Sequence, residues 1–483
     1  MKTLTIAMVK RVFIQKGERG TAMSTKTTLM ELDKRHLLHP ATSAKDNFQH
    51  GPSLLAERGE GVYLYDSDGK RYIDGLAQLW NVNVGHGRKE LAEAAMEQMS
   101  RLAFSHSFNR FSHETVIQLA AKIASLAPGD LNVCHFTSGG SESNDSAFKL
   151  ARHYFALKGQ PQRYKVIARN RAYHGVSMGA TSATGLPVFR EKVGPLADGF
   201  VHAPAPFCYH CELGKTYPDC QLACASQSIR ELLEKEGPET VAAIIVEPIQ
   251  GAGGVIVPPP GYIQEVRSLC DEYGILMIAD EVITGFGRTG KWFGIEHENV
   301  VPDMLTFAKG VTSGYIPLGG VIISDRIHRE LTENSSGVLP HGFTYSGHPA
   351  ACAVALKNIE ILETEGLIDN ARAMGEVLSR HLEQMKAATP GVGNTMCRGL
   401  LAQIELVQDK AGKKSFDPSL KVANQVFEKA LQKGLITRAI SHLGNDIIAL
   451  CPPLNINEQQ LAEAAAILTE SIEEVMSGLA ISQ

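Results

Sequence analysis

An acid and an amine each stand at the end of an apolar run in this chain. Asp280 follows Ile275–Ala279, and Lys309 follows Met304–Ala308. Short apolar runs of this kind are typical of buried strands, and polar side chains at the carboxyl ends of parallel strands gather at one edge of a sheet. A carboxylate and an amine at that edge can hold a flat heteroaromatic ring, the carboxylate at its ring nitrogen and the amine at its aldehyde. The pair therefore predicts a binding site for pyridoxal 5'-phosphate.

The two side chains would have different catalytic roles. Asp280 would keep the ring nitrogen protonated, so that the ring accepts the electron pair left when a substrate loses a proton. Lys309 would bear the cofactor and then move the proton as general base and acid. A lone aspartate at a strand end is more often a helix cap or an ion-pair partner, and most lysines are simply solvated. The prediction therefore depends on the pair, and on the Gly310 that follows Lys309.

A glycine-rich segment, residues 137–145, follows one apolar run and opens a helical pattern. Gly139 and Gly140 let backbone N–H groups approach an anion, the helix N-terminus adds a positive dipole, and the Ser141 hydroxyl is a further donor. The segment fits a phosphate cradle, although a plain strand-to-helix turn has a similar composition. It matches neither the GxGxxG nor the GxxxxGKS pattern.

Two further side chains could hold a flat ring from its two faces. Tyr173, in Tyr173-His174-Gly175 just past the Tyr164–Arg169 run, could stack on one face, and Val282 could press the other. An aromatic side chain packed in an ordinary loop is the alternative interpretation of Tyr173.

The elements that must position these residues alternate between strands and helices. Amphipathic stretches such as Ser143–Leu157 and Gln227–Glu236 lie between short β-branched runs, which predicts a layered α/β domain with a mostly parallel sheet. The predicted buried strands are Val133–Phe136, Tyr164–Arg169, Val241–Val246, Ile275–Ala279, Met304–Ala308 and Gly320–Ile323.

The remaining segments define the expected domains. The Leu54–Asp74 segment reads as a hairpin with a turn at Asp68-Gly69. After Ser346–Pro349 the pattern is mostly helical with two further strands, which predicts a second, smaller α+β domain. The expected parts are a leader (1–28), an N-terminal segment packing on the small domain (29–85), a large domain (86–345) and the small C-terminal domain (346–483).

Composition limits the possible partners. The 483 residues are 44% apolar and 20% charged, with a formal net charge of −5. These values are typical of a large globular protein and give no electrostatic reason to expect nucleic acid or a membrane as partner. The first 26 residues carry six basic side chains against one acidic, which fits a transit peptide, a disordered leader or a true start at Met23. A water-soluble, cytoplasmic protein is expected.

Nine cysteines, odd in number, do not resemble a secreted disulfide framework. The exception is Cys208-Tyr-His-Cys211 with Cys220 and Cys224, whose spacing is close to that of a small zinc site. Loop packing or a redox-sensitive pair are the alternatives, and no metal is assigned.

Taken together, the motifs resemble the class III pyridoxal-phosphate aminotransferases of fold type I, and among them the ω-amino acid or amine:pyruvate aminotransferases. The likeness covers residues 63–454. It rests on Asp74-Gly-Leu-Ala-Gln-Leu-Trp80, Tyr173-His174-Gly175, Glu247-Pro-Ile-Gln-Gly-Ala-Gly-Gly-Val255, Ala279-Asp280-Glu281-Val282, Gly285-Phe-Gly-Arg-Thr-Gly290, Lys309-Gly310, Gly342-Phe-Thr-Tyr-Ser-Gly-His-Pro349 and Cys451-Pro452-Pro453.

The resemblance implies roles for individual residues and a seven-stranded large-domain sheet. Gly139, Gly140 and Ser141 would hold the phosphate, Tyr173 would stack on the ring, Asp280 would pair with the pyridinium, and Lys309 would bear the cofactor. His174 and Glu247 would lie near the cofactor without an assigned step. Thr344 would reach the phosphate of a neighbouring subunit, so a homodimer or a dimer of dimers is expected.

The resemblance also bears on the substrate. Relatives that act on α-amino acids or ornithine carry an arginine just before the Pro-Pro pair, where this chain has Ala449. Arg438 matches the mobile arginine of amine and ω-amino acid enzymes, which binds the carboxylate of pyruvate and withdraws for an apolar amine. Leu79, Trp80 and Phe108 would form apolar walls facing it.

These expectations describe a ping-pong aminotransferase. A primary amine or ω-amino acid would give its amino group to the cofactor, and a keto acid, with pyruvate the expected acceptor, would take it. A mutase or decarboxylase on the same fold, or a zinc-stabilised binding protein without turnover, are the alternatives. The physiological amine stays open among putrescine, β-alanine, taurine, 6-aminohexanoate and arylalkylamines.

Overall fold

The computed structural model describes residues 25–335, 337–441 and 443–481. Most of the predicted leader, residues 1–24, lies outside the described residues. Helix α1 (Thr25–His36) includes the last four residues of that predicted leader.

The described chain forms two compact units. The first contains α1, α2 (Ala44–His50) and the turn at residues 65–70, and the second contains residues 59–64 and everything from Arg71 onward. Strands β1 (Ala56–Glu60) and β2 (Tyr63–Asp66) are divided between the units. The predicted Asp-Gly turn is confirmed, because the Gly69 N–H donates to the Asp66 carbonyl (2.9 Å) and Gly69 has a φ of 83°.

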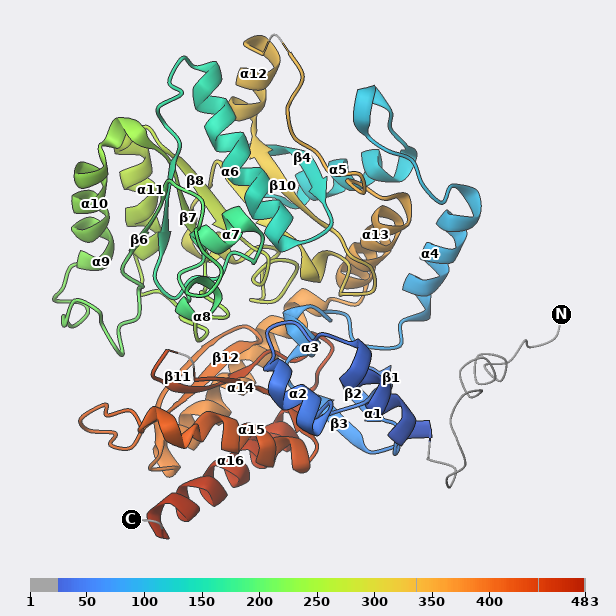
Figure 1. Cartoon of the computed structure of the whole chain (residues 1–483), viewed down its shortest axis with the longest axis vertical. Coiled ribbons are helices and arrows are strands. Elements are labelled where there is room, and N and C mark those ends of the chain that lie inside the picture. The colour runs from blue at the N-terminus through green and yellow to red at the C-terminus, as the bar shows by residue number, and fades with distance from the viewer. Residues whose placement is uncertain (1–24, 336, 442, 482–483) are drawn as a thin grey trace. The chain divides into compact units, whose positions relative to one another are not determined.

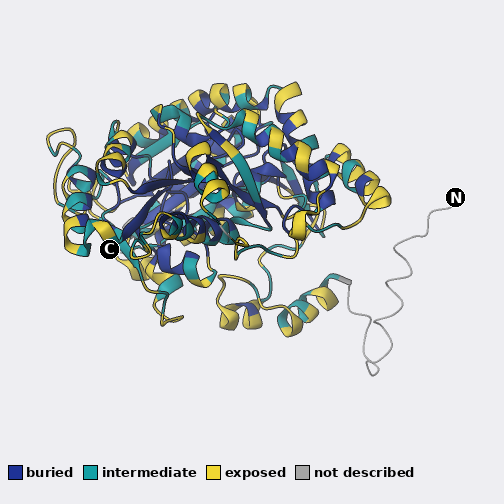
Figure 2. Cartoon of the chain, turned by 90° about the horizontal axis from the view of Figure 1, so that it is seen from above, coloured by how far each residue is buried: buried dark blue, intermediate teal, exposed yellow. Residues whose placement is uncertain are grey.

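The second unit is built on a seven-stranded sheet, as predicted (Figure 1). Only β10 (Gly319–Ser324) runs antiparallel to its neighbours, and β7 (Val241–Val246) and β8 (Leu276–Asp280) are buried along their whole length. Alternate residues point to the two faces of the sheet, and helices cover both faces (Figure 2). The strand order is β4 (Leu131–Thr137), β10 (Gly319–Ser324), β9 (Met304–Phe307), β8 (Leu276–Asp280), β7 (Val241–Val246), β5 (Lys165–Arg169) and β6 (Phe200–Ala203).

Each face has its own apolar layer. Ala243 and Ile245 of β7 pack in one cluster with Phe148 of α6 (Gly140–Leu157), whereas Ile244 and Val246 pack in another with residues of α11 (Tyr262–Tyr273). The longer helices of the sheet region are α4 (Lys89–Arg101), α5 (Glu114–Leu126), α6 (Gly140–Leu157), α10 (Ser228–Glu236), α11 (Tyr262–Tyr273), α12 (Asp325–Glu333) and α13 (Pro349–Thr364).

A smaller antiparallel sheet follows in the C-terminal part. Its order is β11 (Val392–Arg398), β12 (Leu401–Leu406), β15 (Asp446–Leu450) and β14 (Arg438–Ile440). The accompanying helices are α14 (Leu367–Ala388), α15 (Val422–Gln432) and α16 (Glu458–Ile481). The short strand β13 (Leu435–Ile436) instead pairs in parallel with β3 (Arg71–Asp74). The mixed α/β fold with a smaller second sheet is thus confirmed, whereas the exact domain limits stay a prediction.

The second unit also contains the cysteine-rich loop. Cys208, Cys211, Cys220 and Cys224 line one small cavity, and all nine cysteines are free. Within the described ranges no group of three or more His, Cys, Asp or Glu is arranged to hold a metal ion.

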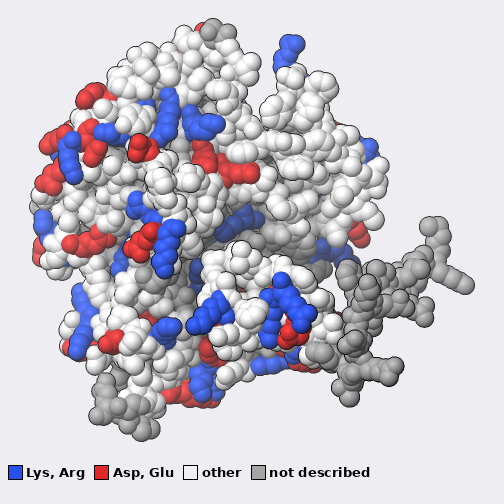
Figure 3. All heavy atoms as spheres, viewed as in Figure 1, with Lys and Arg blue, Asp and Glu red and all other residues white. Residues whose placement is uncertain are grey.

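Hydropathy and surface charge are features of the described residues taken together. In the described part of the chain, no helix has the length and apolar character needed to cross a bilayer. On the face shown in Figure 3, basic and acidic side chains are interspersed, so no single-sign field covers that face.

Candidate active site

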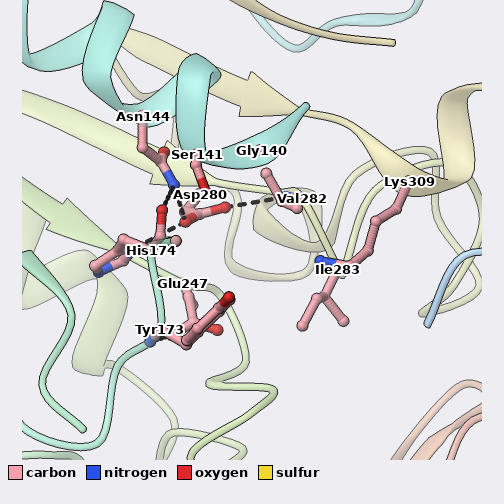
Figure 4. A pocket seen from close by; sticks show the side chains of 11 residues that line it. Gly140, Ser141, Asn144, Tyr173, His174, Glu247, Asp280, Val282, Ile283 and Lys309 are labelled. Atoms are coloured by element: carbon pink, nitrogen blue, oxygen red, sulfur yellow. Dashed lines mark hydrogen bonds and ion pairs between the residues drawn. The ribbon is translucent and has the colours of Figure 1, made fainter. Parts of the chain in front are cut away.

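Asp280 and Lys309 line the same cavity, at the carboxyl edge of the large sheet. Asp280 is the last residue of β8 and pairs in register with Thr306 of β9, and Lys309 lies just beyond β9. In Figure 4, Lys309 enters on the opposite side from Asp280 and its side chain runs toward the centre. The cavity has a volume of about 100 Å³ and is lined by Gly140, Ser141, Asn144, Tyr173, His174, Gly175, Glu247, Asp280, Val282, Ile283 and Lys309.

The Asp280 carboxylate is held by three donors. Its Oδ2 accepts from Asn144 Nδ2 and from His174 Nδ1, each at 2.7 Å, and its Oδ1 accepts from the Val282 N–H at 3.1 Å. Asn144 is itself fixed, because its Oδ1 accepts from the Thr306 hydroxyl at 2.8 Å. The carboxylate is almost fully buried, and a buried carboxylate is tolerated only when it is hydrogen-bonded in this way. Asp280 is therefore oriented rigidly, with lone pairs still available to accept from a ligand.

An anion cradle forms where α6 begins. Gly139 is the N-cap of this 18-residue helix, and the N–H groups of its first turn have no partner within the helix. A Cβ at Gly140 would lie 2.8 Å from Val282, and one at Gly175 would lie 2.3 Å from the Ser141 hydroxyl. Both glycines are thus required by close approaches at the cavity. Gly140 and Ser141 line it, whereas Gly139 lies just outside the lining.

Lys309 is held in a conformation that residues with a side chain seldom adopt. Its φ is 45°, and the Gly310 that follows has no room for a Cβ, which would lie 2.5 Å from Asn83 Nδ2. Burial, and to a smaller extent the charge of Arg438, lowers the pKa of Lys309, while Asp280 and Glu247 oppose that shift. A lysine with a lowered pKa has more of the neutral amine, which is the nucleophilic form.

Tyr173 and Glu247 form the lower wall of the cavity in Figure 4. The Tyr173 N–H donates to Glu247 Oε1 and the Gly251 N–H to Oε2, each at 2.9 Å. Burial raises the pKa of Glu247 to about 7, and the two backbone donors limit that rise. The Tyr173 ring also meets Phe189 edge-on at 5.3 Å, which fixes the ring position. Glu247 therefore braces the Tyr173 loop against β7.

Some predicted residues do not line the cavity. Thr344 and Leu79 are exposed, as is Phe108, and Trp80 is buried in an apolar cluster that includes Ile283. Arg438 lies on β14, half-buried, and comes near enough for its charge to act on Lys309. The structure therefore places most of the predicted cofactor residues around one cavity, with Gly139 and Thr344 outside its lining, and leaves the predicted substrate residues around or outside it.

Three lining residues, Asn144, Gly175 and Ile283, were given no role by sequence reasoning. Asn144 lies one helical turn after Ser141, so the i, i+3 spacing from the phosphate segment could have found it. Ile283 follows Val282 directly and had no chemical signal of its own.

Comparison with known proteins agrees with this geometry. Residues 44–472 match the family model described as aminotransferase class-III. The chain belongs to the class III aminotransferase family. It is 41% identical over 448 residues to the putrescine--pyruvate aminotransferase of Pseudomonas aeruginosa, covering 93% of this chain and 96% of that protein.

Two other relatives extend the comparison. The diaminobutyrate--2-oxoglutarate transaminase of Halomonas elongata is 38% identical, covering 95% of this chain and 98% of that protein. The omega transaminase of Pseudomonas jessenii, solved in complex with PMP, has a TM-score of 0.89 and 37% identity, covering 93% of this chain and 98% of that chain. The class III aminotransferase is thus of the omega-transaminase type, and its family implies pyridoxal 5'-phosphate as cofactor.

The residues of the cavity fit that cofactor. An oriented carboxylate stands ready to accept from a ring N–H, an amine with a lowered pKa faces it, and a glycine-lined helix N-terminus can take a phosphate. His174 Nε2 is buried and has no hydrogen-bond partner among the described residues, so this nitrogen can form a hydrogen bond with a bound ligand.

We predict that Asn144→Ala weakens binding of pyridoxal 5'-phosphate by about ten- to a hundredfold, because it removes a hydrogen bond to a charged carboxylate. The measurement is a fluorescence titration of the apoprotein with the cofactor. Asn132→Ala is the matched control, since Asn132 donates to Asp325 on the surface (3.1 Å). Equal affinity of the Asn144→Ala and wild-type proteins would contradict the assignment.

Proposed function

We propose that this class III aminotransferase moves an amino group from a primary amine or ω-amino acid to a keto acid, with pyruvate as the acceptor. The observation that carries the proposal is the pairing of Arg438 with Ala449 in neighbouring antiparallel strands. Directly opposed residues of such strands point to the same face of the sheet.

That pairing sets the Arg438 guanidinium opposite a small apolar residue. Among the described residues Arg438 forms no ion pair, and Ala449 beside it is fully buried and small. A second arginine at 449 would add a fixed carboxylate clamp and a like charge directly opposite the first, which is unfavourable. One planar guanidinium makes two charge-assisted bonds to one carboxylate, which suits a monocarboxylic keto acid.

The amine side is apolar in character. Trp80, Ile283, Ala449 and Cys451 belong to one apolar cluster, and Ile283 also lines the cavity. Leu79, next to Trp80, keeps 55% of its surface exposed. An apolar wall favours a donor whose carbon chain carries no charge near the reacting amine.

The chain's own residues divide the chemistry between them. When bound, pyridoxal phosphate supplies an electron sink that accepts the electron pair released with the substrate proton. Asp280, fixed by Asn144 and His174, holds a proton at the ring nitrogen. Lys309 takes the proton from the substrate carbon and returns it one position further, a task for which a lowered lysine pKa is suited.

We propose that the active unit is a homodimer or a dimer of dimers with shared sites. Thr344 and its neighbour Tyr345 are exposed in the single chain. Large apolar side chains are also exposed on and after α4, which is the composition of a protein interface. These exposed residues are Met96, Met99, Leu102, Phe104, Phe108 and Phe111. A second copy would cover them and bring Thr344 to the partner's phosphate cradle.

We further propose a cytoplasmic location. The support is the set of nine free cysteines, which fits a reducing compartment.

We predict that Arg438→Met raises the KM for pyruvate by about ten- to a hundredfold, because a charge-assisted hydrogen-bond pair is lost. The reaction of an apolar amine with the bound cofactor, followed by absorbance near 400 nm, should change little. The rate of amino transfer from each amine would be measured with pyruvate and with 2-oxoglutarate as acceptor. Arg380→Met is the control, because Arg380 lies on the exposed side of α14. A strong preference of the wild type for 2-oxoglutarate, or an unchanged KM in Arg438→Met, would contradict the proposal.

The shared site can be tested by mixing two inactive variants. Lys309→Ala removes the amine from one chain, and Thr344→Glu places a negative charge against the phosphate held by the other. Refolded together, they should recover about one quarter of wild-type activity, because half the dimers are mixed and each has one intact site. No recovery, or full activity of Thr344→Glu alone, would argue against a shared site.

A further inference from the structure

The segment Asp74–Trp80, which we call the strained turn, has an unusual backbone. Ala77, Gln78 and Trp80 have φ values of 46°, 57° and 67°, in the region that favours glycine, although none of them is glycine. Gln78 combines its φ with a ψ of −87°, outside the ordinary allowed regions. Such a backbone persists only when the surrounding structure holds it, and strained segments of this kind cluster at functional sites.

A single buried carboxylate holds the strained turn. Asp74, at the end of β3, is fully buried, and its two oxygens both accept from the Gln78 N–H at 3.0 Å. Its Oδ1 also accepts from the Leu76 N–H at 3.3 Å, and its Oδ2 from the Gln78 side-chain amide at 3.1 Å. His86 completes the set, since its Nε2 lies 2.7 Å from Asp74 Oδ2. The donors come from the turn itself and from a histidine twelve residues away.

The histidine is a firm support. The N–H and carbonyl of His86 pair with those of Gly61, at 2.8 and 3.0 Å. A Cβ at Gly59 would lie 2.7 Å from the His86 side chain, so the ring cannot shift toward that strand. The Asp74 carboxylate is therefore tied to a rigid element outside the turn.

The strained turn is also joined to the strands that carry Arg438 and Ala449. Asp74 pairs with Ile436 of β13, two residues before Arg438. The Gly75 carbonyl accepts from the Cys451 N–H at 2.7 Å, two residues after Ala449. A Cβ at Gly75 would lie 2.6 Å from the Ile436 carbonyl, so the two backbones are packed too closely for any side chain at position 75. Any relaxation of the turn would shift Leu79 and Trp80 relative to the cavity.

We propose that Asp74 is a positioning residue that sets the amine selectivity of the enzyme. Its carboxylate keeps the turn in the strained conformation in which Trp80 packs beside Ile283 and Leu79 projects from the surface. The inference rests on the proposed function, in which Leu79 and Trp80 wall the amine side. Loss of the charge lets the turn relax toward ordinary φ values, which displaces that wall but leaves Asp280, Lys309 and the phosphate cradle in place.

The test compares two donors in the first half-reaction. Asp74→Asn keeps the shape but replaces one oxygen, an acceptor only, by a donor that cannot accept from Gln78 or His86. The ratio of kcat/KM for 1-phenylethylamine to that for n-propylamine should change by about tenfold, the scale at which apolar pockets discriminate. The rate with pyruvate in the second half-reaction should stay within twofold. Asp417→Asn is the control, because Asp417 caps an exposed turn through the Ser419 N–H (2.9 Å).

Two further variants link the effect to the turn. Leu79→Ala should change the donor ratio in the same direction, and the double variant Asp74→Asn/Leu79→Ala should be non-additive, since both act on one wall. In the Gln78→Gly background, where glycine adopts the strained φ without penalty, Asp74→Asn should have a smaller effect. If Asp74→Asn does not fold, His86→Leu, which removes one donor, should show the same change in ratio.

The outcomes separate the two claims. If Leu79→Ala leaves the donor ratio unchanged, the wall of the proposed function is wrong. If Leu79→Ala changes the ratio but Asp74→Asn and His86→Leu alter only thermal stability, or slow both half-reactions equally, Asp74 has a structural role alone and the inference is overturned.

Discussion

One buried carboxylate organises the active site. Asp280 carries a charge where there is almost no water, and an unpartnered charge at such a position would cost several kcal/mol. The cost is offset by donors from three separate places, the Asn144 amide of α6, the His174 ring after β5 and the Val282 N–H after β8. The requirement to satisfy one oxygen pair therefore fixes the helix, the loop and the strand end relative to one another.

The rest of the cavity follows from that arrangement. With α6 held against β8 and β9, its N-terminus opens into the same space as Asp280 and Lys309. Burial then acts on the neighbouring titratable groups with opposite sign, since it lowers the pKa of Lys309 and raises that of Glu247 to about 7. An amine with a lowered pKa and a carboxyl group with a raised pKa therefore share one desolvated cavity, and burial tunes groups for acid–base chemistry in this way.

Sequence reasoning succeeded where the signal was local. Apolar runs ending in Asp280 and Lys309 predicted both strands and the edge at which the two side chains meet, because parallel strands present their carboxyl ends together. It failed for β6, β11, β13 and β14, which are short or lie at an edge, so that their burial depends on neighbours far away in the chain. Asn144 was missed because a polar residue in a helix gives no sign of the buried carboxylate that it will meet.

The strained turn is the clearest case of local structure that the local sequence does not predict. The part with positive φ values, Ala77-Gln-Leu-Trp80, contains no glycine, and its conformation accompanies hydrogen bonds from Gln78 and His86 to the buried Asp74 carboxylate. The exposure of Leu79 and Thr344 in the single chain likewise depends on contacts that no local pattern specifies.

The central claim is that Asp280 and Lys309 hold the two sides of one pyridoxal phosphate ring. The most direct measurement is borohydride reduction of the cofactor-loaded wild-type protein, followed by peptide mass spectrometry to locate the fixed pyridoxyl group. The account predicts the label on Lys309, with Asp280→Asn labelled at the same residue but slower by orders of magnitude in turnover. A label on another lysine, or a fully active Asp280→Asn protein, would contradict it.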